Sequence, residues 1–209
     1  MLRSRTLSVC LLTSASLILG ACAFAVLGGG RRPSHVRPSG RDRGSRMLIA
    51  GVPLYRQWDA RWAEQFMKPS RATMRRYGCL VCCVSMLFSH YGIATTPGEL
   101  NGYLSSNGGY TGSGLLKWGP CARYTSGRAR VDYIGGPNGK RLATEVASGN
   151  PVIVKVRLSG GAFHWVLVVG YREGDYLVHD PLGEENGPVK LSRFGRMIHA
   201  MRIFRRVEI

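Results

Sequence analysis

The chain has 209 residues, of which 44% are hydrophobic and 20% are charged, and this combination is typical of one globular domain with additional segments. Lysine and arginine number 29 against 12 acidic residues, which gives a formal net charge of +17. No run of basic residues with interleaved aromatic residues accompanies this charge, so nucleic acid is not an expected partner. A basic face directed toward anionic lipid or cell wall is the preferred interpretation.

Residues 1–21 have the pattern of a bacterial export signal. A positively charged start precedes an apolar stretch over residues 7–19, as in secretory leaders. The sequence Leu-Gly-Ala-Cys that ends at Cys22 resembles the lipobox of bacterial lipoproteins, which implies cleavage before Cys22 and attachment of lipid to it. Two alternatives stay open: residues 7–27 remain as a membrane anchor, or the leader is removed and the protein is secreted. All three possibilities place the domain outside the cytoplasm, and lipidation and the uncleaved anchor would each tether it to the membrane of the cell envelope.

Residues 22–46 are predicted to be a flexible linker. Residues 28–46 contain three successive glycines, two prolines and six arginines. Such a composition buries little apolar surface and predicts a solvated spacer. The folded domain is therefore expected over residues 47–209. It should begin with a strand over residues 47–54, and a basic loop is expected over residues 68–76.

The stretch from Cys79 to Gly92 is predicted to form a core helix, because apolar residues occupy nearly every face of it. Cys79 would begin this helix, where unpaired N–H groups and the helix dipole favour a thiolate. A thiolate is the form of cysteine that acts as a nucleophile. The competing interpretation, which is commoner for a lone cysteine, is a buried structural residue.

Three further cysteines of the domain, Cys82, Cys83 and Cys121, bear on redox and metal chemistry. A disulfide from Cys82 or Cys83 to Cys121 stays open in an oxidising compartment. Cys79 and Cys82 form a C-x-x-C pattern, but no second ligand pair follows at a suitable spacing. Neither a metal nor a cofactor is therefore expected.

The middle of the chain is predicted to contain short helices and one strand. Thr96 as N-cap, Pro97 at the first position and Glu99 at the third position predict a helix that continues to about Leu104. The remaining predicted elements are a loop over 105–114, a short helix over 114–124, a strand over 130–134 and a helix over 140–148 that ends at Gly149.

The C-terminal third is predicted to form a β-sheet. An apolar run over residues 151–156 indicates a central strand. Residues 163–171 and 176–180 are joined by a turn at 173–175 and form a predicted hairpin. Alternation of apolar and basic residues over 198–207 indicates a closing strand at the sheet edge.

A base for Cys79 must come from the five histidines. His90 lies on the same predicted helix, roughly 16 Å from Cys79, which is too far. His164 begins one strand of the hairpin and Asp180 ends the other, so the hairpin brings the two to one level. We expect the His164 ring to be exposed at a cleft edge, with its Nδ1–H donating to Asp180 as in a catalytic triad. His179 points to the opposite face and is the weaker candidate.

Four blocks of sequence resemble those of a known family. They are Gly78-Cys79 with Met86-Leu87 and Tyr91-Gly92, residues 149–154 (Gly-Asn-Pro-Val-Ile-Val), residues 164–171 (His-Trp-Val-Leu-Val-Val-Gly-Tyr) and residues 176–183 (Tyr-Leu-Val-His-Asp-Pro-Leu-Gly). The pattern is similar to that of the C39-like peptidase family, which has a papain-like fold. The resemblance implies an α+β fold in which an N-terminal helical part, with the nucleophile helix, packs on a C-terminal antiparallel β-sheet.

The same resemblance implies residue roles. Cys79 corresponds to the nucleophile, His164 to the general base and acid, and Asp180 to the residue that orients His164. Gln57 is similar in context to the family's oxyanion-hole glutamine, and Gln65 is the alternative. Residues 80–83, Leu-Val-Cys-Cys, replace the small and polar residues often found there in the family.

The resulting hypothesis is an exported, membrane-tethered, monomeric cysteine peptidase that hydrolyses peptide bonds of a peptide or protein substrate through a thioester. Two alternatives stay open. One is an acyl or amide transferase with the same triad, which would pass the thioester to an amine or thiol. The other is a non-catalytic papain-like module that binds peptide or glycan.

Overall fold

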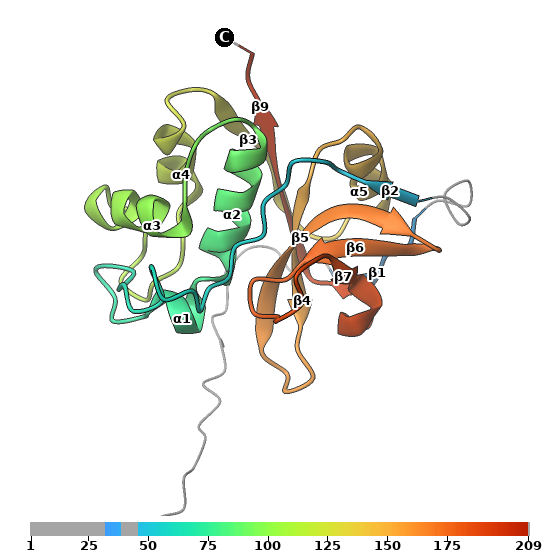
Figure 1. Ribbon diagram of the computed structural model, residues 1–209, viewed down its shortest axis with the longest axis horizontal. Helices are drawn as coiled ribbons and strands as arrows, with labels where there is room; N and C mark the ends of the chain where they lie inside the picture. Colours follow the sequence, from blue (N-terminus) through green and yellow to red (C-terminus); the bar gives the residue numbers. More distant parts are fainter. Residues whose placement is uncertain (1–31, 39–45, 209) are drawn as a thin grey trace, which may run out of the picture.

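The computed structural model describes residues 32–38 and 46–208, and these form a helical half and a sheet half (Figure 1). The helical half contains α1 (Met74–Tyr77), α2 (Cys79–His90), α3 (Pro97–Ser106) and α4 (Trp118–Tyr124). The sheet half contains the long strands and α5 (Gly139–Ala147). The expected α+β fold, with the helical part first and the sheet second, is confirmed.

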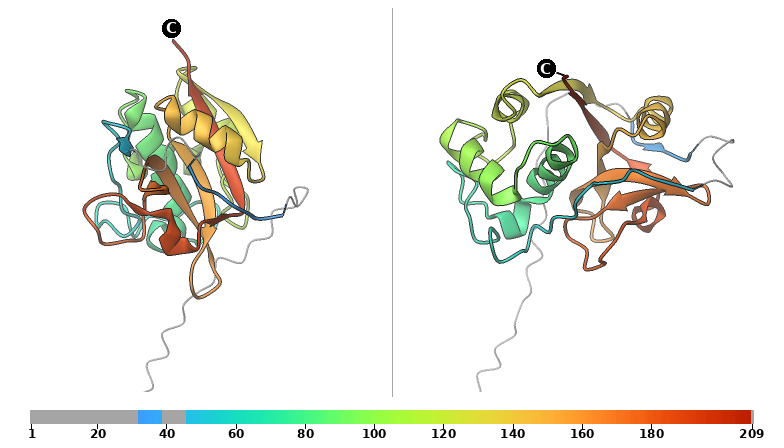
Figure 2. Two further views of the ribbon diagram at one scale, coloured as in Figure 1. Left: turned by 90° about the vertical axis from the view of Figure 1, so that its right-hand side faces the viewer. Right: turned by 45° about the horizontal axis from the view of Figure 1, so that its top comes forward.

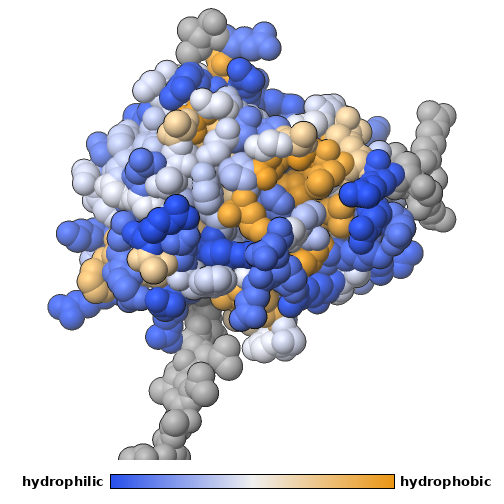
Figure 3. Space-filling view, in the orientation of Figure 1, coloured by the Kyte–Doolittle hydropathy of each residue, from blue (hydrophilic) through white to orange (hydrophobic). Residues whose placement is uncertain are grey.

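The main sheet is antiparallel and has the strand order β3–β9–β4–β5–β6–β7, with β2 paired to β5 beside this path. Its strands are β2 (Arg46–Leu48), β3 (Ala129–Gly135), β4 (Val152–Arg157), β5 (Phe163–Arg172), β6 (Asp175–His179), β7 (Val189–Lys190) and β9 (Ala200–Arg206). A separate pair joins β1 (Ser34–His35) to β8 (Met197–Ile198), and the short 3-10 helix η2 (Leu191–Phe194) precedes β8. On the face shown in Figure 3, hydrophilic residues surround an apolar area over the sheet half.

The two faces of the sheet belong to two hydrophobic cores. Ile153, Leu167 and Val169 pack in the core that contains α2, whereas Val154 and Val168 pack in the core that contains the buried residues of α5. This division follows from the alternation of side chains along a strand. The right-hand view of Figure 2 accordingly shows α2 and α5 on opposite sides of the strands.

Helix α2 begins at Cys79, as predicted, and nine of its twelve residues are buried. Burial on all sides explains why its sequence has no polar face. Gly78 precedes it because a Cβ at that position would lie 2.5 Å from the carbonyl oxygen of Met74. The helix ends before Gly92, whose φ of +78° is a left-handed conformation that glycine adopts readily.

Two other predicted local features are confirmed. The hydroxyl of Thr96 accepts a hydrogen bond from the Glu99 N–H, and the Glu99 carboxylate accepts one from the Thr96 N–H at 2.7 Å, which completes a capping box at the start of α3. Strands β5 and β6 form the expected hairpin. Its two turn residues, Glu173 and Gly174, have φ angles of 53° and 72°, and such left-handed pairs match the twist of the flanking strands.

Two segments predicted before α2 differ from the structure. The predicted strand over 47–54 is reduced to β2, which ends at Leu48, and Pro53 beyond it has no N–H to donate to a sheet. The predicted basic loop over 68–76 contains the start of α1, because Met74 is fully buried and its N–H donates to the Gln65 carbonyl at 2.9 Å.

The predicted edge strand over 198–207 is β9, which lies inside the sheet between β3 and β4. Five consecutive residues of β9, from Ala200 to Phe204, are buried. The basic residues that suggested an exposed edge are accommodated differently. Arg202 is buried against aromatic rings, and Arg205 pairs with carboxylates.

Part of the predicted spacer packs on the domain. Ser34 and His35 pair with β8, and the Val36 N–H donates to the Arg196 carbonyl at 3.0 Å. The Val36 side chain is 2% exposed, so the expectation of a solvated chain is wrong for this stretch. The buried Val36 side chain and the backbone pairing with β8 hold this stretch against the sheet half.

The predicted export signal and Cys22 lie outside the described residues. Within residues 32–38 and 46–208, none of the helices has the length and apolar character needed to span a bilayer.

Candidate active site

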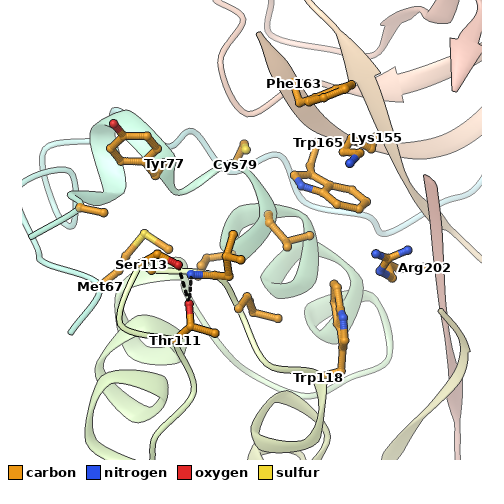
Figure 4. Close-up of a pocket in the computed structure, with 16 residues that line it drawn as sticks. Met67, Tyr77, Cys79, Thr111, Ser113, Trp118, Lys155, Phe163, Trp165 and Arg202 are labelled. Carbon is orange, nitrogen blue, oxygen red and sulfur yellow. Dashed lines mark hydrogen bonds between the residues drawn. The ribbon is translucent and has the colours of Figure 1, made fainter. Parts of the chain in front are cut away.

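Cys79 is the first residue of α2, and its side chain stands at the junction between the helical half and the sheet half (Figure 4). It is 7% exposed. The N-cap residue, Gly78, has no side chain to cap the first N–H groups of the helix. These groups and the helix dipole therefore favour negative charge on the sulfur.

His164 and Asp180 lie on the sheet side of the same junction and are hydrogen bonded to each other. His164 is the second residue of β5, and Asp180 directly follows the last residue of β6. The Nε2–H of His164 donates to Oδ1 of Asp180 at 2.6 Å, and the two residues are 3% and 6% exposed. The hairpin thus brings together the two residues that sequence analysis paired.

Two details of this pair differ from expectation. The ring donates from Nε2 and not from Nδ1, and it is buried rather than exposed. The backbone N–H of Leu182 also donates to Oδ1 of Asp180, at 2.9 Å, which fixes the carboxylate where it meets Nε2. Because Nε2 is occupied, Nδ1 is the ring nitrogen left for the thiol of Cys79, whose interaction with the His164 side chain helps to raise the pKa of that histidine.

The electrostatics of the site favour a protonated imidazole. Burial opposes the charge on His164, but hydrogen bonds and opposite charge from Asp180 and Cys79 outweigh it and raise the pKa of His164 to about 9. Burial alone would raise the pKa of Asp180. The hydrogen bond from His164 and those from the backbone of Leu182 and Gly183 hold the pKa of this carboxyl below its usual range instead.

Gln57 lies between the Asp180 segment and the turn that precedes Cys79. Its backbone N–H donates to the Pro181 carbonyl at 2.9 Å, and its Nε2 donates to the Arg75 carbonyl at 2.7 Å. The residue is 3% exposed. An amide nitrogen carries two N–H groups, so one donor of Gln57 remains for another acceptor.

Gln65, the alternative, is exposed, and its Oε1 accepts a hydrogen bond from Asn101 of α3 at 3.1 Å. This contact holds it on the helical half. The geometry therefore distinguishes the two glutamines that sequence analysis left open, and only Gln57 contacts the Asp180 segment.

Sequence analysis missed the residues that fix the segment around Gln57. Arg56 Nη1 donates to the Asp180 carbonyl at 2.7 Å, and Trp58 Nε1 donates to the Leu182 carbonyl at 3.3 Å. His179, the weaker candidate base, donates from Nδ1 to the Pro53 carbonyl at 3.1 Å. The one indication in the sequence was that residues 55–62 are rich in aromatic and charged side chains. This composition does not identify the carbonyl groups that they bind.

A cavity of about 270 Å³ lies beside Cys79, between the two halves of the molecule (Figure 4). The helical half contributes Tyr77, Cys79 and Trp118 to its wall, and the sheet half contributes Phe163 and Trp165. Phe163 and Trp165 flank His164 in β5, so their side chains point to the opposite side of the strand from the His164 ring.

The other cysteines of the described segments are free thiols, so none forms the disulfide that sequence analysis left open. Cys82, Cys83 and Cys121 are fully buried, and burial raises the pKa of each thiol. Cys79 is the one cysteine among these residues that lines the cavity. Within the same residues, no cluster of three or more histidine, cysteine or acidic side chains could hold a metal ion.

The model of the Peptidase_C39 like family matches residues 49–197. The chain belongs to this family. The matched range includes Cys79, Gln57, His164 and Asp180. Membership of a C39-like family supports a cysteine peptidase in general.

The fold agrees with this assignment. A crystal structure described as a C39-like peptidase from Bacillus anthracis matches with a TM-score of 0.54 and 15% identity, over 78% of this chain and all of that chain. A double-glycine motif protease from an AMS/PCAT transporter, in complex with its leader peptide, matches with a TM-score of 0.43 and 14% identity, over 82% of this chain and 99% of that chain. No curated protein matches this C39-like chain. The expectation of a C39-like fold is confirmed.

The pKa of His164 can be tested directly. We expect NMR titration to give a pKa of about 9 for His164 in the intact protein. In Asp180→Asn this pKa should be much lower, because the carboxylate that offsets the effect of burial is absent. Because the folded-state pKa lies above the ordinary value of 6.5, the proton on His164 stabilises the fold fully below about pH 6.5. This stabilisation is lost as the pH rises through about 9.

Glu173→Gln removes a carboxylate from the far end of the same hairpin and serves as the control. It should leave the titration of His164 unchanged. An equal pKa for His164 in the intact protein and in Asp180→Asn would contradict the electrostatic account.

Proposed function

We propose that this protein is an exported, membrane-tethered cysteine peptidase that hydrolyses peptide bonds through Cys79, His164 and Asp180. The observation that carries the proposal is the buried hydrogen bond of 2.6 Å between His164 and Asp180 at the junction where Cys79 begins α2. A histidine held by a carboxylate and hydrogen bonded to a thiol is the arrangement that activates a cysteine nucleophile. Family membership adds independent support.

The first half of the reaction forms a thioester. Transfer of the Cys79 proton to His164 gives a thiolate and an imidazolium, and the raised pKa of His164 favours this pair. The thiolate attacks the carbonyl carbon of a peptide bond and forms a tetrahedral oxyanion. Collapse of this intermediate breaks the C–N bond, and His164 gives its proton to the leaving amine.

The second half hydrolyses the thioester. Neutral His164 removes a proton from water as the water attacks the thioester carbonyl. A second oxyanion forms and collapses, which breaks the C–S bond and releases the carboxylic acid. His164 returns its proton to the Cys79 thiolate, which restores the starting thiol and neutral imidazole. Atoms and protons therefore balance over the cycle. Throughout, the Asp180 carboxylate holds the ring through Nε2.

Oxyanion stabilisation is assigned to the backbone N–H of Cys79 and the side-chain amide of Gln57. The Cys79 N–H is among the first N–H groups of α2, which have no acceptor within the helix. Gln57 is held rigidly because its Nε2 donates to the Arg75 carbonyl while its backbone donates to the Pro181 carbonyl. Fixed donors of this kind stabilise developing charge without reorganisation.

The nucleophile can be tested by alkylation of the protein with iodoacetamide, followed by mass mapping of each cysteine. Cys79 alone should react quickly below pH 8, because Cys82, Cys83 and Cys121 are buried. His164→Ala should slow this reaction by about a hundredfold or more. His90→Ala, which removes a histidine from the other end of the same helix, is the matched control and should have little effect. Slow labelling of Cys79 in the intact protein would favour the non-catalytic module instead.

The role of Gln57 can be separated from folding and from thiol activation. Gln57→Ala should lower kcat for peptide hydrolysis by about a hundredfold or more, as loss of an oxyanion donor does in other enzymes. It should leave the alkylation rate of Cys79 nearly unchanged. Gln65→Ala is the matched control and should keep full activity. Equal losses in the two variants would contradict the assignment. Addition of hydroxylamine to the same assay traps the thioester as a hydroxamate, and hydroxamate formation by a protein that does not hydrolyse the peptide without it would identify a transferase.

The tether is proposed from the sequence that ends at Cys22, outside the described residues. Metabolic labelling with an azido fatty acid should modify the intact protein and Cys10→Ala, but not Cys22→Ala. Mass analysis of the N-terminus gives the second readout. An unmodified chain that stays in the membrane fraction and retains residues 1–21 would contradict lipidation and identify an uncleaved anchor. An unmodified chain in the soluble fraction would contradict tethering altogether.

A further inference from the structure

Two cationic side chains face the cavity beside Cys79. The guanidinium of Arg202, in β9, lies 5.1 Å from the ring centroids of both Trp118 and Trp165. The ammonium of Lys155, in β4, lies 4.4 Å from the ring centroid of Phe163 and 5.8 Å from that of Trp165. Figure 4 shows both cations on the sheet side of the cavity, close to Trp165.

Neither cation has an acidic partner within the part of the chain that the structure describes. Arg202 Nη1 donates to the carbonyls of Gly135 at 3.2 Å and Met201 at 2.7 Å, but its Nε is buried with no hydrogen-bond partner among these residues. Arg205, three residues further along β9, contrasts with it because it pairs with the carboxylates of Asp132 and Glu145. Of these two arginines of β9, Arg205 therefore has carboxylate partners, whereas Arg202, beside the cavity, has none.

Burial of an unpaired cation is unfavourable. Arg202 is only 7% exposed, and burial lowers its pKa to about 10. Burial also lowers the pKa of Lys155, and repulsion from Arg202 lowers it further. The faces of the surrounding aromatic rings attract these cations but cannot replace an anion.

The other walls of the cavity are mainly aromatic and aliphatic, with Leu115 and Leu116 among them, and the hydroxyls of Thr111 and Ser113 are hydrogen bonded to each other. They match an apolar stem, whereas Arg202 and Lys155 match a carboxylate at its end. An acidic side chain, above all glutamate, has both features. A carboxylate in this position would complete the hydrogen bonding of Arg202 and reduce the repulsion between the two cations.

The position of the cavity relative to His164 indicates which part of a substrate it receives. In the proposed mechanism the leaving amine takes its proton from His164, so it departs on the side of that ring. Phe163 and Trp165, which line the cavity, alternate to the other side of β5. The cavity therefore faces the acyl part of the substrate, which stays attached to Cys79.

We propose that this cavity is a specificity pocket that binds an acidic side chain on the acyl side of the scissile bond, through Arg202 and Lys155. This inference rests on the proposed function of Cys79 as nucleophile. It adds a substrate class: peptides that carry a glutamate or aspartate before the cleaved bond.

The test uses the full-length protein and two matched sets of acyl-dipeptide fluoromethyl ketones, which alkylate a nucleophilic cysteine and need no known substrate. Each set is a pair of reagents, one with Glu and one with Gln at the same position. In the first set this position is the first residue from the ketone, and in the second set it is the second residue. At one of these positions Glu should inactivate the protein about tenfold to a hundredfold faster than Gln, the range expected for a charge-assisted hydrogen bond. Mass mapping must locate the label on Cys79.

Three variants assign the preference. Lys155→Met and Arg202→Met should each lower the Glu/Gln rate ratio toward one while the rate with the Gln reagents changes little. Arg172→Met removes a charge from the exposed far end of β5, outside the cavity, and should keep the ratio. Lys155→Met is decisive if Arg202→Met fails to fold, because Lys155 is only partly buried and its ammonium has no hydrogen bond or ion pair among the described residues.

The outcomes separate the two proposals. If neither reagent labels Cys79, the proposed function fails, and the specificity pocket with it. If Glu and Gln reagents label Cys79 equally fast at both positions, the nucleophile stands and the acidic specificity is overturned. A Glu preference that survives in Lys155→Met and Arg202→Met would also overturn it, because the long-range positive charge of the chain would then be the cause.

Discussion

The packing of α2 against β5 is the contact on which the candidate site depends. The helix is buried on nearly all sides, and the thiol of Cys83 donates to the Trp165 carbonyl of the strand at 3.4 Å. A helix enclosed in this way cannot shift along its axis without opening cavities in a close-packed core. Its first residue, Cys79, is therefore held at a fixed distance from the strand that carries His164. The nucleophile comes from one half of the molecule and its partners from the other.

A second constraint is the stabilisation of buried positive charge. His164 and Arg202 differ in the partners that provide it. Both side chains are almost fully buried, and burial disfavours the charged form of each. His164 has Asp180 and Cys79 beside it, so its pKa rises in spite of burial. Arg202 has two backbone carbonyls and two indole rings, and its pKa falls. Both cations are buried, but His164 has an anionic partner within the protein, whereas Arg202 in the adjoining cavity has none.

Much of this arrangement was predictable from local sequence. The apolar pattern after Gly78 predicts α2, and a turn at residues 173–175 between two apolar runs predicts the hairpin that joins His164 to Asp180. What could not be predicted depends on distant contacts. The ring nitrogen that meets Asp180 is set by the backbone of Leu182, and the interior place of β9 depends on Arg202 fitting between rings from α4 and β5. A four-residue helix such as α1 is too short to show periodicity.

The charges of the site and the cavity fit together when they are considered as one set. The thiolate of Cys79 and the carboxylate of Asp180 are compensated by the imidazolium of His164 and the N-terminus of α2. A substrate carboxylate brought close to this thiolate would be repelled unless cations stood beside it. Lys155 and Arg202 supply that compensation from β4 and β9, strands that adjoin in the sheet. An acidic substrate residue is therefore compatible with an anionic nucleophile because the sheet places two cations on the cavity side of β5, away from the Asp180 carboxylate that already holds His164.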